Sequence, residues 1–211
     1  METIQTAVFS YDELSTFAQE KARDWYRMGA CVLDEYDCVF EDAADAAAIF
    51  GLDIRTRAGK RMNGGAHYAP AIFFSGFSSQ GDGACFEGNY FYRKGALAAV
   101  KAYAPEDTEL HRIVAELQNI QRKAFYKLSA RTTHHGRYYH SGCMNVSVGV
   151  DADRYPTDTE EESLAECMRD FADWIYKQLE AEHDYQNSDE QVAEAIRSNE
   201  YTFTEDGARF G

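Results

Sequence analysis

Residues 71–92 have the sequence AIFFSGFSSQGDGACFEGNYFY, in which two aromatic runs flank a turn-rich connection. The runs at 71–77 and 85–92 are rich in Ile, Phe and Tyr, which favour β-strands. The connection at 78–83 supplies the Gly, Asp and Ser that turns require. The stretch therefore predicts an antiparallel β-hairpin at the centre of the chain.

Helical periodicity and capping residues predict helices on both sides of this hairpin. A capping box formed by Ser10 and Glu13 predicts a helix that ends at Gly29, and Gly51 is placed to end the next helix in the left-handed conformation. A second box, Ser188 with Gln191, predicts a short helix near the C-terminus. The other predicted helices cover 33–50, 95–103, 107–128 (expected to be the longest) and a segment from 158 or 159 onward.

Further strands are predicted where apolar residues alternate or cluster, and the mixed order of elements indicates the fold class. Residues 59–70 are predicted to form a glycine-rich loop. Strands and helices in mixed order favour an α+β fold, with helices packed on a mostly antiparallel sheet. No linker or repeat divides the chain, so we expect a single domain over 1–211, the alternative being a helical C-terminal extension over 155–211. The additional strands are predicted at 3–8, 53–57, 129–134, 144–150 and 201–204.

The chain is acidic and rich in aromatic residues. Its 211 residues carry a formal net charge of −15, the pI is about 4.7, and aromatic residues make up 14%. Such a charge repels phosphates and anionic lipids, which argues against nucleic-acid or membrane binding and favours a basic protein partner. The alternative is that the acidic residues only keep the protein in solution.

The cysteines and the N-terminus predict a cytoplasmic protein. The five cysteines are widely spaced and include no C-x-x-C pair, which argues against a disulfide framework and favours a reducing compartment. The first ten residues lack the basic and apolar regions of a signal peptide, and no apolar run is long enough to span a bilayer.

Cys85 is the candidate nucleophile. Residues 82–85, Asp-Gly-Ala-Cys, resemble the Asp-Gly-x-Cys signature of ovarian-tumour-type cysteine proteases. A cysteine nucleophile needs a base, which His140 or the pair His134 and His135 could supply, with Asp82 as a further candidate. In those proteases the cysteine begins a helix, whereas Cys85 opens a predicted strand, where a cysteine is usually a small core residue.

A polar segment at 132–143 holds three histidines and Cys143 within about ten residues, a composition that could bind zinc. Adjacent histidines on a strand point to opposite faces, so His134 and His135 cannot both face one ion. No paired cysteine motif or Glu-containing metalloprotease motif accompanies them. We therefore predict no metal and no cofactor, and expect these side chains to line a surface.

The helix predicted over 33–50 carries an acidic face. Asp34, Asp37, Glu41 and Asp45 recur at spacings of three and four residues, so they stack along one side, roughly 5–6 Å apart. That spacing is close to the spacing of phosphates along a nucleic-acid strand. We predict that these four residues bind a partner, the alternative being the solvated face of an amphipathic helix.

The chain contains, in this order, the segments Tyr11-Asp-Glu-Leu-Ser, Lys21-Ala-Arg-Asp-Trp-Tyr, the stretch 74–88, Tyr103-Ala-Pro, Glu109-Leu-His-Arg-Ile and Tyr138-Tyr-His-Ser-Gly-Cys. Together these segments resemble a family of small acidic proteins encoded by bacteriophages and their bacterial hosts. Its members are commonly labelled antitoxins of toxin–antitoxin stability systems, or uncharacterised. The resemblance covers most of the chain to about Asp151 and implies a setting of phage–host conflict, without catalytic residues to carry over.

Three hypotheses of function follow. The first is an inhibitor that binds a basic defence component or toxin by protein–protein contact, as an anti-CRISPR protein or an antitoxin does. The second is a cysteine-dependent enzyme built on Cys85. The third is a protein that binds a small signalling molecule near the hairpin at 75–88.

Overall fold

The computed structural model describes residues 7–30, 36–60 and 66–211. The chain divides into two compact units, one formed by Met1–Glu35 with Ala181–Gly211 and the other by Tyr36–Glu180. Strands and helices alternate, and every paired strand is antiparallel to its neighbour, so the predicted α+β class is confirmed. Whether residues 1–211 act as a single domain stays a prediction.

The unit over 36–180 is built on a four-stranded antiparallel sheet in the order β2-β7-β8-β9. The strands are β2 (Leu52–Ile54), β7 (Gly88–Phe91), β8 (Leu128–His134) and β9 (Met144–Val150), and the predictions of strands at 129–134 and 144–150 are confirmed. One row of aligned residues joins Leu52, Tyr90, Ala130 and Val148, and the adjacent row joins Asp53, Asn89, Arg131 and Ser147. Because side chains alternate along a strand, the two rows face opposite sides of the sheet.

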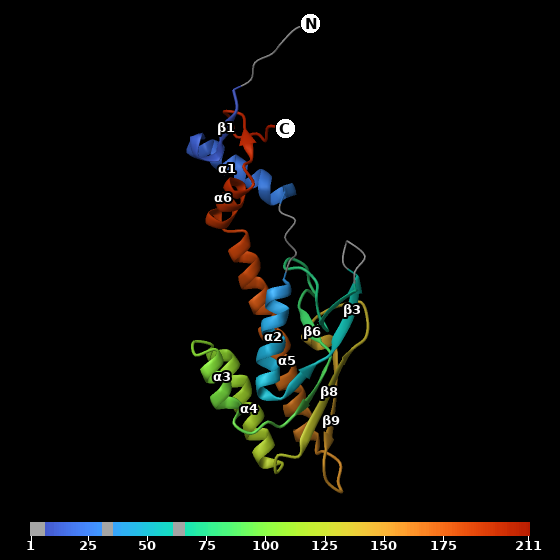
Figure 1. Cartoon of the computed structure of the whole chain (residues 1–211). Helices are drawn as coiled ribbons and strands as arrows, with labels where there is room; N and C mark the ends of the chain where they lie inside the picture. Colours follow the sequence, from blue (N-terminus) through green and yellow to red (C-terminus); the bar gives the residue numbers. More distant parts are fainter. Residues whose placement is uncertain (1–6, 31–35, 61–65) are drawn as a thin grey trace. The chain divides into compact units, whose positions relative to one another are not determined.

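Among the described residues, the helices that cover this sheet lie on one of its sides (Figure 1), the side whose core includes Leu52 and Tyr90. They are α2 (Asp37–Phe50), α3 (Ala96–Tyr103), α4 (Thr108–Lys123) and the first part of α5 (Asp158–Gln186). Aromatic rings fill the space between helices and sheet, with Phe171 in edge contact with Phe50 at 5.0 Å and with Phe86 at 5.6 Å between ring centroids. The predicted left-handed cap at Gly51 is confirmed by its φ of 94°.

Two hairpins flank the four-stranded sheet. β5 (Ile72–Phe74) pairs with β6 (Ala84–Phe86), which confirms the hairpin predicted from residues 71–92. β3 (Thr56–Lys60) pairs with β4 (Ala66–Pro70), so the prediction of a loop over 59–70 was wrong at 59–60 and 66–70, while 61–65 lie outside the described residues. The hairpin was not predicted because the segment contains glycine and proline residues. Both are depleted in strands, and Pro is tolerated only at an edge or a strand end.

The lengths of two helices differ from the predictions. α5 has 29 residues and α4 has 16, so the helix expected over 107–128 is not the longest of the described elements. α4 ends at Lys123 because the chain turns at Phe125 and Tyr126, whose φ values are 55° and 63°. The positive φ values belong to side chains that seldom adopt them, and no glycine marks the turn.

The unit formed by the chain ends has its own small core. Within it β1 (Phe9–Ser10) pairs with β10 (Thr202–Phe203) beside α1 (Thr16–Trp25) and α6 (Asp189–Ser198). The capping box of Ser10 and Glu13 is present, but it caps the short 3₁₀ helix η1 (Tyr11–Glu13), and α1 has Ser15 as its N-cap. α1 continues into a π-helical turn, η2 (Tyr26–Ala30). Ser188 caps α6 as predicted, while the strand expected at 3–8 lies largely outside the described residues.

The last strand of the sheet, β9, lies at an edge. Its sequence, MNVSVGV, contains no charged residue and no proline, the two devices that most often protect an exposed strand edge. Its valines pack against the core, while Asn145 and Ser147 are exposed.

Across residues 7–30, 36–60 and 66–211, none of the helices combines the length and apolar character needed to cross a membrane.

Candidate functional site

The acidic face predicted for the second helix lies on α2. Phe40, Ala43 and Ala47 on one side of α2 are buried in the core, and Asp37, Glu41 and Asp45 on the other side are exposed. The fourth predicted residue, Asp34, lies outside the described residues. The structure therefore places three carboxylates on a helix that the core holds in position.

Asp42 belongs to the same exposed side and was not among the predicted residues. Its Oδ1 accepts a hydrogen bond from the Tyr103 hydroxyl of α3, and that bond, followed by burial, raises the pKa of Tyr103 to about 12. No described basic side chain forms a salt bridge with Glu41, Asp42 or Asp45. The charges of Glu41, Asp42 and Asp45 are therefore available to a partner.

The two chemistry-bearing segments of the sequence, 75–88 and 132–143, meet in space. A Cβ added to Gly83 would lie 2.6 Å from the His140 Cβ, so the close approach of the two segments requires glycine at position 83. Asp82 does not face a histidine: its Oδ2 accepts hydrogen bonds from the backbone N–H groups of Ser78 at 2.9 Å and Ser79 at 2.6 Å. The Asp82 carboxylate thus holds the turn of its own segment.

His140 is paired with Cys143. The His140 Nε2 lies 3.1 Å from the Cys143 Sγ, within the short 3₁₀ helix region η3 (Ser141–Cys143), and Cys143 is half-buried. Cys85 on β6 is 0% exposed, and burial raises the pKa of its thiol to about 12, with Cys143 and Glu87 adding to the effect. A His-x-x-Cys spacing is the sequence signal that could have singled out Cys143.

The other histidines of the segment are separated. His134 is held by two hydrogen bonds and two ring contacts. Its Nε2 lies 2.8 Å from the Tyr138 carbonyl oxygen, and its backbone N–H donates to Glu87 Oε1 at 3.4 Å. Its ring centroid lies 5.0 Å from that of Tyr139 and 5.8 Å from that of Phe73. His135 is exposed. In the described part of the chain, no group of three or more His, Cys, Asp or Glu residues is arranged to hold a metal ion.

A groove of about 610 Å³ opens where β2, β3, β5 and β7 adjoin, on the uncovered side of the sheet. In this groove the Arg55 Nη1 lies 3.5 Å from the Glu87 Oε2, and the Arg57 guanidinium lies 4.9 Å above the centre of the Phe73 ring. Sequence reasoning missed both arginines, although both fall within the strand predicted at 53–57; in the structure Arg55 lies between β2 and β3, and Arg57 lies on β3. The lining comprises Asp53, Ile54, Arg55, Thr56, Arg57, Ala71, Phe73, Glu87 and Asn89.

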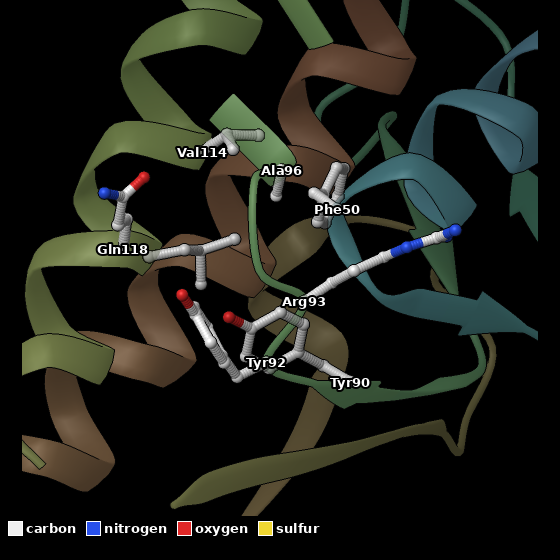
Figure 2. A pocket seen from close by; sticks show the side chains of 8 residues that line it. Phe50, Tyr90, Tyr92, Arg93, Ala96, Val114 and Gln118 are labelled. Atoms are coloured by element: carbon white, nitrogen blue, oxygen red, sulfur yellow. The ribbon is translucent and has the colours of Figure 1, made fainter. Parts of the chain in front are cut away.

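A second opening lies on the helical side, between α4 and the end of β7. Figure 2 shows Tyr90, Tyr92 and Phe50 around it, with Val114 and Gln118 projecting from α4. Its volume is about 10 Å³, which corresponds to a single water molecule at most. It is a packing gap, so the groove on the opposite side is the stronger candidate for a ligand site.

Comparison with known proteins identifies one family. The model described as "Domain of unknown function (DUF8835)" matches residues 36–189, well over half of the chain, and the chain belongs to that family. The matched range contains the whole of the unit over 36–180 and therefore α2, the two meeting segments and the groove. No curated protein and no solved structure matches the chain.

Proposed function

We propose that this DUF8835 protein is a phage-derived binding protein that inhibits a basic host defence component or a toxin by protein–protein contact. The partner would be a protein that attracts anions, such as a nucleic-acid-binding defence effector, and would dock on the acidic face of α2. The observation that carries the proposal is that no described basic side chain neutralises Glu41, Asp42 or Asp45 on this face.

Rigidity and charge support this function. The opposite side of α2 is anchored by fully buried residues such as Phe50 and Ala46, so the carboxylates are presented at fixed helical spacing. Interfaces gain association rate and specificity from complementary charge, and a net charge of −15 would speed encounter with a basic partner. Such binding weakens as salt screens exposed charges.

The test is capture of a partner from a lysate that carries defence systems, using tagged full-length protein. The double variant Glu41→Gln/Asp45→Asn removes two charges from α2, and Asp42 is left in place because it binds Tyr103. The matched control, Glu161→Gln/Glu162→Gln, removes the same charge from exposed positions on α5. The proposal expects a basic protein that wild type and control retain, that salt releases, and that the α2 variant loses. Equal capture by both variants would contradict it.

Thiol chemistry is a second candidate, favoured by the 3.1 Å contact between the Cys143 Sγ and the His140 Nε2. A histidine at this distance can take the thiol proton, whereas Cys85 is buried and has a pKa of about 12. The measurement is the rate at which iodoacetamide alkylates Cys143 in the folded protein, with the exposed Cys38 as the internal reference. Activation predicts faster alkylation of Cys143 and its loss in His140→Gln; a Cys143 slower than Cys38 in wild type would end this candidate.

A further inference from the structure

We propose that the groove on the uncovered side of the sheet, between β2, β3, β5 and β7, binds a nucleotide, with Arg57 taking the phosphate and Asp53 the base. The inference is independent of the α2 face and of any protein partner. It rests on the size of the groove, on an oriented guanidinium that pairs with no carboxylate of the described residues, and on the acceptors Asp53 and Asn89 in the same lining.

The shape and polarity of the groove suit a small polar ligand. Its volume of about 610 Å³ lies within the range of roughly 300–1,000 Å³ that ligand pockets occupy. The register brings Asp53 opposite Asn89 and Asn89 opposite Arg131, and directly opposed side chains lie about 4.5–5.5 Å apart. A row of polar side chains therefore crosses the sheet from the groove outward.

The Arg57 side chain is positioned by an aromatic ring, and no carboxylate of the described residues neutralises its charge. Its guanidinium lies 4.9 Å from the centre of the Phe73 ring, and Phe73 is itself stacked on Tyr139 at 5.7 Å with 15° between the ring planes. Neither Arg57 nor Arg131 forms an ion pair with a carboxylate of the described residues. A planar guanidinium beside a ring keeps its N–H donors in the fork that matches phosphate.

The other polar groups of the groove disfavour an anion that has no hydrogen-bond donors of its own. Arg55 is already paired with Glu87, and Glu87 also accepts from the His134 backbone N–H, so these two groups are satisfied. The exposed Asp53 carboxylate, by contrast, forms no salt bridge with a described residue and faces the same side as Asn89. A carboxylate accepts N–H groups and repels phosphate.

A nucleotide is a class of ligand that can form hydrogen bonds with both Arg57 and Asp53. A nucleotide carries a phosphate for Arg57 and, on its base, N–H groups for Asp53 and the amide of Asn89. An inorganic phosphate would meet Arg57 but gain nothing from Asp53, and a nucleoside would leave Arg57 without its anion. The groove should therefore bind the joined molecule more tightly than either part.

The experiment is isothermal titration of the full-length chain with AMP, GMP, adenosine, guanosine and inorganic phosphate. At least one nucleotide should bind, and more tightly than its nucleoside or phosphate. Arg57→Gln should weaken that binding roughly tenfold to a hundredfold, because it removes hydrogen bonds to a charged group. Asp53→Asn should weaken the nucleotide and leave the affinity for phosphate unchanged or higher.

The matched control is Arg122→Gln, which makes the same charge change at an exposed position on α4. Both arginines are exposed, so circular dichroism should show folded variants and any loss of binding will report on the site. The proposal is overturned if no nucleotide binds wild type, if a nucleoside or phosphate binds as tightly as the nucleotide, or if Arg57→Gln and Arg122→Gln have equal affinity.

Discussion

The two sides of the four-stranded sheet differ sharply, although they are made from alternate residues of the same strands. On the helical side, Tyr90 is 2% exposed and its row includes Leu52 and Ala130. On the other side, Phe91 is 61% exposed, and no helix of the described residues covers the side on which the polar row of Asn89 and Arg131 lies (Figure 1). The first side holds the fold together, and the second leaves recognition groups accessible on a rigid support.

The strongest test of this difference compares neighbours on β2. Leu52→Ala should lower the free energy of unfolding by about 2–5 kcal/mol, because it removes a fully buried side chain and leaves a cavity. Asp53→Ala, one residue further on the exposed side, should change it by no more than about 0.5 kcal/mol. Urea denaturation of both variants makes the comparison. Similar losses would show that the uncovered side is also structural.

The next largest loss of stability is expected when the buried side-chain amide of Gln121 is removed. Gln121 on α4 donates from Nε2 to the Leu128 carbonyl oxygen at 2.7 Å and accepts from the Leu128 N–H at 3.2 Å, which satisfies the first residue of β8. Gln121→Leu leaves both backbone groups without these bonds and should cost about 1–3 kcal/mol. Gln118→Leu, at an exposed position of the same helix, is the control. Equal thermal stability of the two variants would contradict the assigned role.

Tyr90 makes the helical side sensitive to alkali. Burial raises the pKa of Tyr90 from an ordinary value of 10.0 to about 12. The folded pKa exceeds the unfolded one, so the neutral phenol contributes stability that is complete below pH 10 and is lost as the pH rises toward 12. Tyr90→Phe should shift alkaline unfolding, followed by circular dichroism, to higher pH. An unchanged midpoint would mean that another group controls unfolding at high pH.

The smallest effect is expected at Ser147, which ends the exposed polar row on β9. Ser147→Ala removes a hydroxyl from solvent and should change stability by less than about 0.5 kcal/mol. Differential scanning calorimetry of this variant beside wild type measures the shift. A loss of several degrees in the melting temperature would reveal a contact that the accessible position of Ser147 does not suggest.

Local patterns predicted the elements whose own residues determine them. The central hairpin, β8, β9 and the Gly51 cap follow from alternation and turn chemistry. The end of α4 could not be predicted, because Phe125 and Tyr126 adopt positive φ without a glycine to indicate it. The β3–β4 hairpin was missed because its pairing, from Thr56 with Pro70 onward, depends on partners and not on strand propensity.

The candidate sites also differ in whether local sequence patterns could predict them. Helical spacing was enough to place Asp37, Glu41 and Asp45 together on α2, since only one helix is involved. The pairing of His140 with Cys143 is equally local. The groove combines Asp53 of β2, Arg57 of β3 and Glu87, which lies between β6 and β7. Residues 53–57 and 85–92 were each predicted as one strand, whereas the structure divides each of them between two sheets, so local sequence patterns gave no means of assembling the groove.

The uncharged edge strand β9 limits the pH range in which solutions of this protein stay clear. At neutral pH each molecule carries a net charge of about −15, and mutual repulsion keeps one β9 edge from pairing with another. Near pH 4.7 that repulsion vanishes while the strand itself, having no ionisable side chain, is unchanged. Acidification should therefore bring turbidity before it brings unfolding, and storage buffers well above the isoelectric point will keep solutions clear.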